Sequence, residues 1–178
     1  MGTGPLITHP VYATQPAEQP DERADGRPII RVLVVDDLPR YRRELRTICS
    51  SEKDLSVVGE AASGQEALAL VKLLEPDVIL MDLQMPGMDG VQATELIMRA
   101  NPEARVILLT VFRDVENILS ALQAGARAHL PKSSLSDEII HMVRAVYRGK
   151  SLVDSQVTAR VLDQFRRLAE LHAEPGLR

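Results

Sequence analysis

The chain has 178 residues and 45% hydrophobic side chains, enough for one domain with extra segments and a buried core, and its 3% aromatic content predicts that this core is aliphatic. A formal net charge of −4 at pH 7 argues against direct nucleic-acid binding by this chain. The single cysteine, Cys49, excludes a disulfide framework and a cysteine-based metal site and fits a cytoplasmic location, and no apolar run reaches the roughly 18 residues of a membrane span.

Residues 1–28 are predicted to form a disordered tail. They hold five of the 11 prolines and few large apolar side chains, so they cannot bury enough surface to offset the loss of chain entropy. They also lack the basic and then apolar pattern of a secretory signal peptide. We therefore expect an ordered domain over residues 29–150, followed by a C-terminal linker and helix over residues 151–178.

Five apolar runs rich in β-branched residues predict strands, and the segments between them have helical periodicity. The expected strands are residues 29–37, 55–61, 76–82, 104–110 and 126–131. The expected helices are residues 39–51, 64–74, 90–100, 115–125 and 134–149. Local signals mark several helix ends, namely Pro39 in a first turn, Ser63 and either Ser134 or Ser136 as N-caps, and Gly125 and Gly149 as C-terminal stops.

The alternation of five strands with five helices predicts an α/β fold, with an open parallel sheet covered by helices on both faces. In doubly wound sheets of this kind, ligands bind beyond the carboxyl ends of the strands, where the strand order reverses. The functional site is therefore expected at that edge of the sheet.

Charged residues stand at these strand ends. The run "VILMDLQMPGMDG" takes a strand that looks buried into a carboxylate, Asp82, and burying an unpaired carboxylate would be very unfavourable. The first strand ends in Asp36 and Asp37, the fourth ends in Thr110, and Lys132 follows the fifth. Three carboxylates in one cleft repel one another unless a cation joins them, and oxygen ligation of this kind suits Mg²⁺. These residues predict a pocket for a phosphoryl group on Asp82.

Residues 29–150 resemble the receiver domain of response regulators in two-component signalling, through "VLVVDD", "DVILMDLQMPGMDG", "VILLT" and "AHLPK". The resemblance implies a flavodoxin-like fold, a doubly wound five-stranded sheet in the order 2-1-3-4-5 with five helices. It also implies that Asp82 takes a phosphoryl group from a phosphohistidine of a sensor histidine kinase and later loses it by hydrolysis. Such a domain is a switch rather than an enzyme, and it signals by conformational change and dimerisation.

The resemblance further implies a metal site. Asp37 and Asp82 would contact Mg²⁺, or Mn²⁺, directly, and Asp36 would act mainly through water. The backbone carbonyl of Gln84 would be a further ligand.

Thr110 and Lys132 would hold the phosphoryl group, and Thr110 and His129 would be the switch residues. Three positions depart from the usual pattern: Val111 replaces a small residue and would narrow access to the acceptor, His129 replaces a Tyr or Phe, and Pro131 precedes the lysine rather than following it. We expect His129 to be a half-buried ring rather than a pH-sensitive switch. Pro131 is compatible with a strand at the edge of the sheet.

The output surface is expected on the fourth helix, fifth strand and fifth helix. The apolar residues Val115, Ile118, Leu119 and Leu122 are too many for all of them to be buried under one face of the fourth helix.

After Gly149, "GKSLVD" and an amphipathic helix that begins near Asp154 or Ser155 resemble the linker of LuxR-type (NarL/FixJ-like) transcription regulators. In those proteins a helix-turn-helix domain follows. The chain stops near the point where that domain would begin, so contact with nucleic acid would require a domain that is absent from this chain. The output domain would be either truncated or naturally missing.

Two other functions stay open. A pseudo-receiver would bind partners without phosphorylation, and Val111 favours that alternative. A Mg²⁺-dependent phosphohydrolase also uses an aspartyl phosphate, but such enzymes carry the nucleophile in a D-x-D arrangement after the first strand. Here the lone Asp82 follows the third strand, which disfavours the enzyme.

Overall fold

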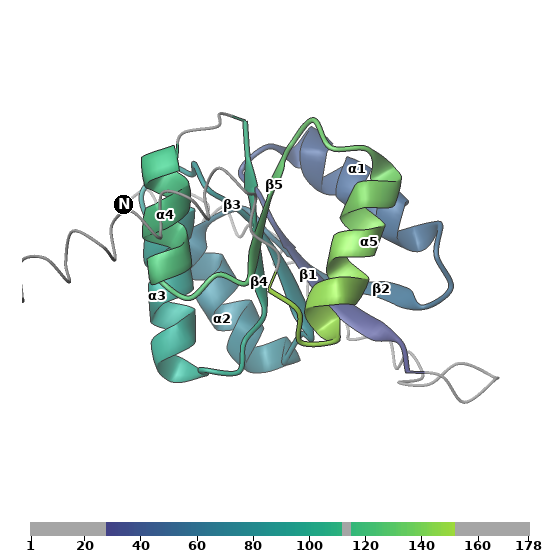
Figure 1. Cartoon of the computed structure of the whole chain (residues 1–178), viewed down its shortest axis with the longest axis horizontal. Helices are drawn as coiled ribbons and strands as arrows, with labels where there is room; N and C mark the ends of the chain where they lie inside the picture. Colours follow the sequence, from purple (N-terminus) through teal and green to yellow (C-terminus); the bar gives the residue numbers. More distant parts are fainter. Residues whose placement is uncertain (1–27, 112–114, 152–178) are drawn as a thin grey trace, which may run out of the picture.

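The computed structural model describes residues 28–111 and 115–151, and the chain folds there around one five-stranded parallel sheet in the order β2-β1-β3-β4-β5 (Figure 1). The strands are β1 (Ile30–Val35), β2 (Leu55–Ala61), β3 (Val78–Asp82), β4 (Val106–Thr110) and β5 (Ala128–Pro131). The predicted α/β class and strand order are confirmed. The predicted N-terminal tail, apart from Pro28, and the predicted C-terminal amphipathic helix lie outside the described residues.

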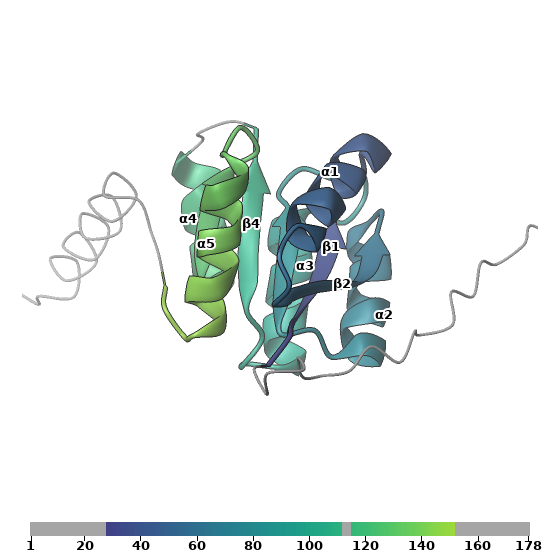
Figure 2. The same ribbon diagram turned by 90° about the vertical axis from the view of Figure 1, so that its right-hand side faces the viewer.

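Within residues 28–111 and 115–151, five helices cover both faces of the sheet. They are α1 (Pro39–Ser50), α2 (Gly64–Leu74), α3 (Gly90–Ala100), α4 (Val115–Gln123) and α5 (Ser136–Tyr147). α1 and α5 pack on one face, and α2, α3 and α4 pack on the other (Figures 1 and 2). In the described part of the chain, no helix has both the length and the apolar character needed to cross a bilayer.

The central strand β1 contributes alternate side chains to two separate cores. Val32 and Val34 join the cluster under α1 and α5, whereas Leu33 and Val35 join the cluster under α2, α3 and α4. All four are completely buried. Burial of each such side chain contributes about 1.5–3 kcal/mol, so β1 is held firmly and the residues that follow it have a fixed position. Coverage on both faces also explains why β1 and β3 are continuous apolar runs.

The register of the sheet brings the functional strand ends to one edge. Val35, the last residue of β1, pairs with Met81, the residue before Asp82. At the other side of the sheet, Thr110 at the end of β4 pairs with Pro131 at the end of β5. Four carboxyl ends therefore lie along the same edge, as expected for parallel strands.

Several predicted helix signals are confirmed. Pro39 is the first residue of α1. The hydroxyl oxygen of Ser63 accepts a hydrogen bond from the N–H of Glu66 at 3.2 Å and caps α2. Gly125 and Gly149 have φ angles of 107° and 81°, a region that glycine adopts readily and other residues avoid, and each lies just beyond a helix.

The predicted cap of α5 is wrong. The N-cap is Leu135, in extended conformation, and not Ser134 or Ser136. A turn closed by the N–H of Ser134 on the carbonyl of Pro131 at 3.0 Å carries the chain past Ser134, and Ser136 is already helical. The carboxylate of Glu138 accepts the N–H of Leu135 at 3.1 Å, so a side chain from the first turn satisfies the exposed donor.

The expectation of an excess apolar face on α4 concerns four residues, and the structure describes the side chains of three of them. Ile118 and Leu119 are only 3% and 6% exposed, and Leu122 packs against the core cluster under α2, α3 and α4. The side chain of Val115 lies outside the description. For these three residues the spacing of three and four marks a core-facing stripe of α4, and the expectation for all four stays a prediction.

Candidate functional site

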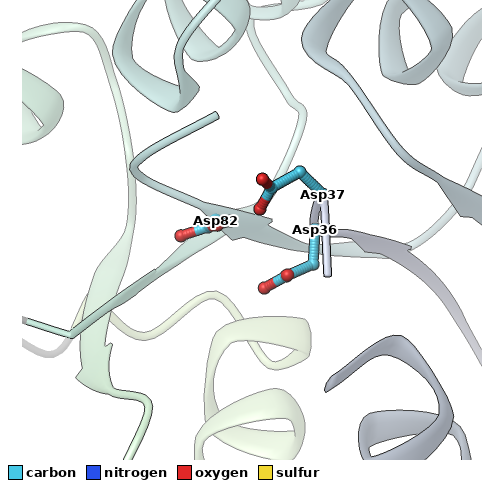
Figure 3. Close-up of side chains that lie close together, drawn as sticks. All are labelled: Asp36, Asp37 and Asp82. Carbon is cyan, nitrogen blue, oxygen red and sulfur yellow. The ribbon is translucent and has the colours of Figure 1, made fainter. Parts of the chain in front are cut away.

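Three carboxylates meet at the carboxyl edge of the sheet. Asp36 and Asp37 follow β1 and Asp82 ends β3 (Figure 3). Each offers one oxygen atom within 4.8 Å of the oxygen atoms of the other two. Asp36 and Asp82 are 0% and 3% exposed, and Asp37 is half-buried. Such a concentration of negative charge is unfavourable without a cation.

Lys132, the residue after β5, supplies one cation. Its Nζ atom lies 2.5 Å from Oδ2 of Asp36 and 2.9 Å from Oδ2 of Asp82, and its side chain is 11% exposed. One ammonium cannot balance three carboxylates, and Asp37 has no ion pair with another residue in the described part of the chain. The pocket keeps an excess of negative charge, and its oxygen-only donor set matches what a hard divalent cation such as Mg²⁺ requires.

The environment of the pocket shifts the pKa values of both Asp82 and Lys132. Burial raises the pKa of Asp82 above its usual range, although Lys132 and the N–H of Gln84 act in the opposite direction. Burial would lower the pKa of Lys132, but its hydrogen bonds to Asp36 and Asp82 outweigh that effect and its pKa is raised. The lysine therefore stays charged, and Asp82 pays a desolvation penalty when it is ionised.

Backbone groups hold the acids in place. Oδ1 of Asp36 accepts the N–H of Leu38 at 2.9 Å, and Oδ1 of Asp82 accepts the N–H of Gln84 at 3.2 Å. The guanidinium of Arg42 donates to the backbone carbonyl of Asp36 at 2.6 Å. These bonds orient the carboxylates before any ligand binds.

The loop after Asp82 turns back so sharply that only glycine fits at position 90. The N–H of Gly90 donates to the carbonyl of Leu83 at 3.0 Å, and a Cβ atom on Gly90 would overlap the backbone carbonyl of Asp82. The predicted helix at this point is confirmed, but the sequence did not reveal that Gly90 limits the position of Asp82.

The other predicted residues lie on β4 and β5 and in the loops that follow β1, β3 and β4. Thr110 is buried at the end of β4, and its backbone carbonyl accepts the N–H of Lys132 at 2.7 Å. Gln84 and Asp37 line a cleft of about 540 Å³ beside the pocket. His129 is half-buried on β5, where it pairs with Leu108, and Val111 is 62% exposed.

Tyr41 is a contact of the pocket that the sequence did not reveal. Its hydroxyl donates to the backbone carbonyl of Lys132 at 3.3 Å, and its ring centroid lies 4.8 Å from Nζ of the same lysine. Burial raises the pKa of Tyr41 well above its usual range, so the phenol stays protonated. Two features of the sequence pointed to Tyr41 as a residue near the pocket: it follows Asp37 by four residues, about one helical turn, and it is one of only three tyrosines in the chain.

Comparison with known proteins gives consistent results. The sequence profile of the response regulator receiver domain matches residues 32–144. Transcriptional regulatory protein LiaR of Bacillus subtilis is 39% identical over 142 residues, which cover 80% of this chain and 67% of LiaR.

Solved structures agree in fold. The signal receiver domain of NarL from Mycobacterium tuberculosis is 37% identical, with a TM-score of 0.67 over 68% of this chain and 98% of that domain. The CheX–CheY–BeF₃⁻–Mg²⁺ complex of Borrelia burgdorferi contains a chain that is 28% identical, with a TM-score of 0.65 over 71% of this chain and 96% of that one. The profile match, the sheet order and the identities agree, and the chain belongs to the response-regulator receiver domain family.

Proposed function

We propose that this chain is a phosphorylation-driven switch of a two-component system, in which Asp82 accepts a phosphoryl group from a phosphohistidine of a sensor histidine kinase. One observation carries the proposal: acids from β1 and β3 meet the amine of Lys132 in one pocket of a receiver domain. Asp82 is the candidate acceptor because β3 lies between β1 and β4. It therefore has the acids of β1 on one side, and Thr110 and Lys132 on the other.

In the proposed transfer, a carboxylate oxygen of Asp82 forms a bond to phosphorus while the P–N bond of the phosphohistidine breaks, and the imidazole leaves with that electron pair. Lys132 and the hydroxyl of Thr110 would then hold phosphoryl oxygens. Hydrolysis of the aspartyl phosphate by water would return the carboxylate and release inorganic phosphate. The proximity of Lys132 to Asp82, 2.9 Å in the resting pocket, supports this role.

A divalent cation is the second part of the proposal. Asp37 and Asp82 would hold Mg²⁺ or Mn²⁺ directly, with the carbonyl of Gln84, and Asp36 would act mainly through water, as the resemblance to receiver domains implies. When bound, the ion supplies positive charge that offsets charge on the phosphoryl oxygens. The excess of carboxylates over amines in the pocket supports it.

We also propose that phosphorylation is read out by protein contact on the face formed by α4, β5 and α5, including self-association. Thr110 at the end of β4 and His129 on β5 would be the switch residues, since both adjoin that face. Sedimentation with and without phosphorylation checks this, and Asp82→Asn is the control that should not respond.

LiaR is a transcriptional regulatory protein, and we extend that role to this chain. The receiver would control a DNA-binding segment of the kind found in LuxR-type regulators. A net charge of −4 argues against DNA binding by the 178 residues themselves, and a mobility-shift assay should detect none.

Incubation with acetyl phosphate and Mg²⁺, followed by intact-mass measurement, tests the proposal. We expect a gain of one phosphoryl group in the wild type, and no gain with EDTA or in Asp82→Asn. A wild type that never gains the group would instead be a pseudo-receiver. Steady release of phosphate from a small phosphate ester such as p-nitrophenyl phosphate would indicate a phosphohydrolase.

A further inference from the structure

Tyr41 contacts Lys132 at two points. It lies in the first turn of α1 and is only 8% exposed. Its hydroxyl donates to the backbone carbonyl of Lys132 at 3.3 Å, and the ammonium lies 4.8 Å from its ring centroid, within the range of a cation–π interaction. One aromatic side chain therefore binds both ends of the lysine, its main chain and its charge.

The same ammonium also faces two acids, at 2.5 Å from Asp36 and 2.9 Å from Asp82. A lysine side chain is flexible and loses about 2 kcal/mol of rotamer entropy when it is fixed. The acids attract the ammonium, and the ring of Tyr41 is a third, uncharged partner. Phosphorylation of Asp82 would replace one of these ion pairs, whereas the contact with the ring does not depend on the charge of Asp82.

We infer that Tyr41 is a positioning residue that holds the ammonium of Lys132 where a phosphoryl group on Asp82 requires it. The inference rests on the proposed function, because the lysine has this task only if Asp82 is the acceptor. Tyr41 itself touches neither the acceptor carboxylate nor the phosphoryl group in this scheme. Its effect passes through Lys132.

Two substitutions separate the ring from the hydroxyl. Tyr41→Phe keeps the aromatic face, and Tyr41→Leu removes it while it preserves an apolar side chain. The matched control is Tyr147→Leu, since the ring of Tyr147 lies 5.8 Å from the guanidinium of Arg105. Arg105 directly precedes β4, so this second cation–π contact lies at the opposite edge of the sheet from the pocket.

The first measurement is the rate of phosphorylation by acetyl phosphate at saturating Mg²⁺. We expect Tyr41→Leu to slow it about fivefold, corresponding to about 1 kcal/mol of lost cation–π interaction. Tyr41→Phe and Tyr147→Leu should stay within about twofold of the wild type. Rescue by Phe distinguishes the ring from the hydroxyl.

The second measurement does not depend on activity or metal. Ring current from Tyr41 should shift the ε-methylene protons of Lys132 upfield in the NMR spectrum of the metal-free wild type and of Tyr41→Phe. In Tyr41→Leu these signals should move to ordinary lysine positions. Circular dichroism checks folding, and Tyr41→Met repeats the test if the Leu variant does not fold.

Four outcomes separate the claims. A Tyr41→Leu variant phosphorylated as fast as the wild type overturns the positioning role, and so does a Tyr41→Phe variant as slow as Tyr41→Leu. Lysine signals that stay unshifted in the wild type overturn the contact itself. A wild type that is never phosphorylated, with its lysine signals shifted as expected, contradicts the proposed function instead.

Discussion

The ammonium of Lys132 lies 2.9 Å from Oδ2 of Asp82, so an amine that follows β5 reaches across β4 to a carboxylate at the end of β3. This ion pair explains how a buried-looking strand can end in an acid. It also leaves the pocket with an excess of negative charge, because Asp36 and Asp37 add two further carboxylates.

Removal of the amine should destabilise the metal-free protein. Lys132→Met leaves Asp36 and Asp82 buried and without their shared cation, and breaking a buried pair by removing one partner costs about 3 kcal/mol. Urea unfolding in EDTA measures this loss. The matched control is Lys53→Met, at an exposed lysine between α1 and β2, which should change the stability by less than about 0.5 kcal/mol. Equal stability of the two variants would contradict the role of Lys132.

Removal of the charge of Asp82 should have the opposite effect at neutral pH. Burial raises the pKa of Asp82, so the fold disfavours its charged form. A raised folded-state pKa contributes stability that is fully present below the unfolded pKa, near 4, and is lost as the pH rises through the folded value. Asp82→Asn should therefore melt at a higher temperature than the wild type at pH 7 in EDTA, and the difference should shrink on acidification.

Calorimetry from pH 4 to pH 7 measures this difference. Asp137→Asn, at an exposed position in the first turn of α5, is the control for the loss of one carboxylate. A lower melting temperature for Asp82→Asn at pH 7 would mean that the ion pair with Lys132 outweighs burial.

A divalent cation should stabilise the wild-type fold by mass action. At a concentration of 100 times its Kd, Mg²⁺ should add about 2.7 kcal/mol to the free energy of unfolding. Thermal denaturation with and without Mg²⁺ detects the gain, and Asp37→Asn should abolish most of it because Asp37 is a proposed direct ligand. A gain of the same size in Asp37→Asn would place the ion elsewhere.

Substitution of Gly90 should disturb the position of Asp82. In Gly90→Ala, the new methyl group would overlap the backbone carbonyl of Asp82, and overpacking of this kind costs about 1–3 kcal/mol. Both the free energy of unfolding and the affinity for Mg²⁺ should fall. The control is Gly149→Asn, since Gly149 has open space around it and Asn tolerates its φ of 81°. Unchanged metal affinity in Gly90→Ala would show that the turn does not position Asp82.

The centre of the site could be located from the sequence, because parallel strands place their carboxyl ends at one edge whatever the details of packing. The convergence of Asp36, Asp37, Asp82 and Lys132 follows from that rule. The contact of Tyr41 with Lys132 could not be located, since it depends on the rotation of α1 against the sheet.

Details of two helices could not be predicted from the sequence, for similar reasons. Apolar spacing on α4 indicates a stripe, but it does not say whether a neighbouring layer covers that stripe, and Ile118 and Leu119 turned out to be buried. At the start of α5, serine is the commoner cap, but the turn from Pro131 to Ser134 fixed the entry of the chain and left Leu135 at the cap position. Both outcomes depend on tertiary packing.

The identity of the phosphorylated side chain tests the central claim most directly, because three carboxylates share the pocket. Borohydride reduces an aspartyl phosphate to homoserine, so peptide mapping of protein treated with acetyl phosphate, Mg²⁺ and then borohydride marks the acceptor. We predict homoserine at position 82 and unmodified aspartate at positions 36 and 37. Homoserine at either of those two positions, or a phosphorylated protein with Asp82 intact, would contradict the account.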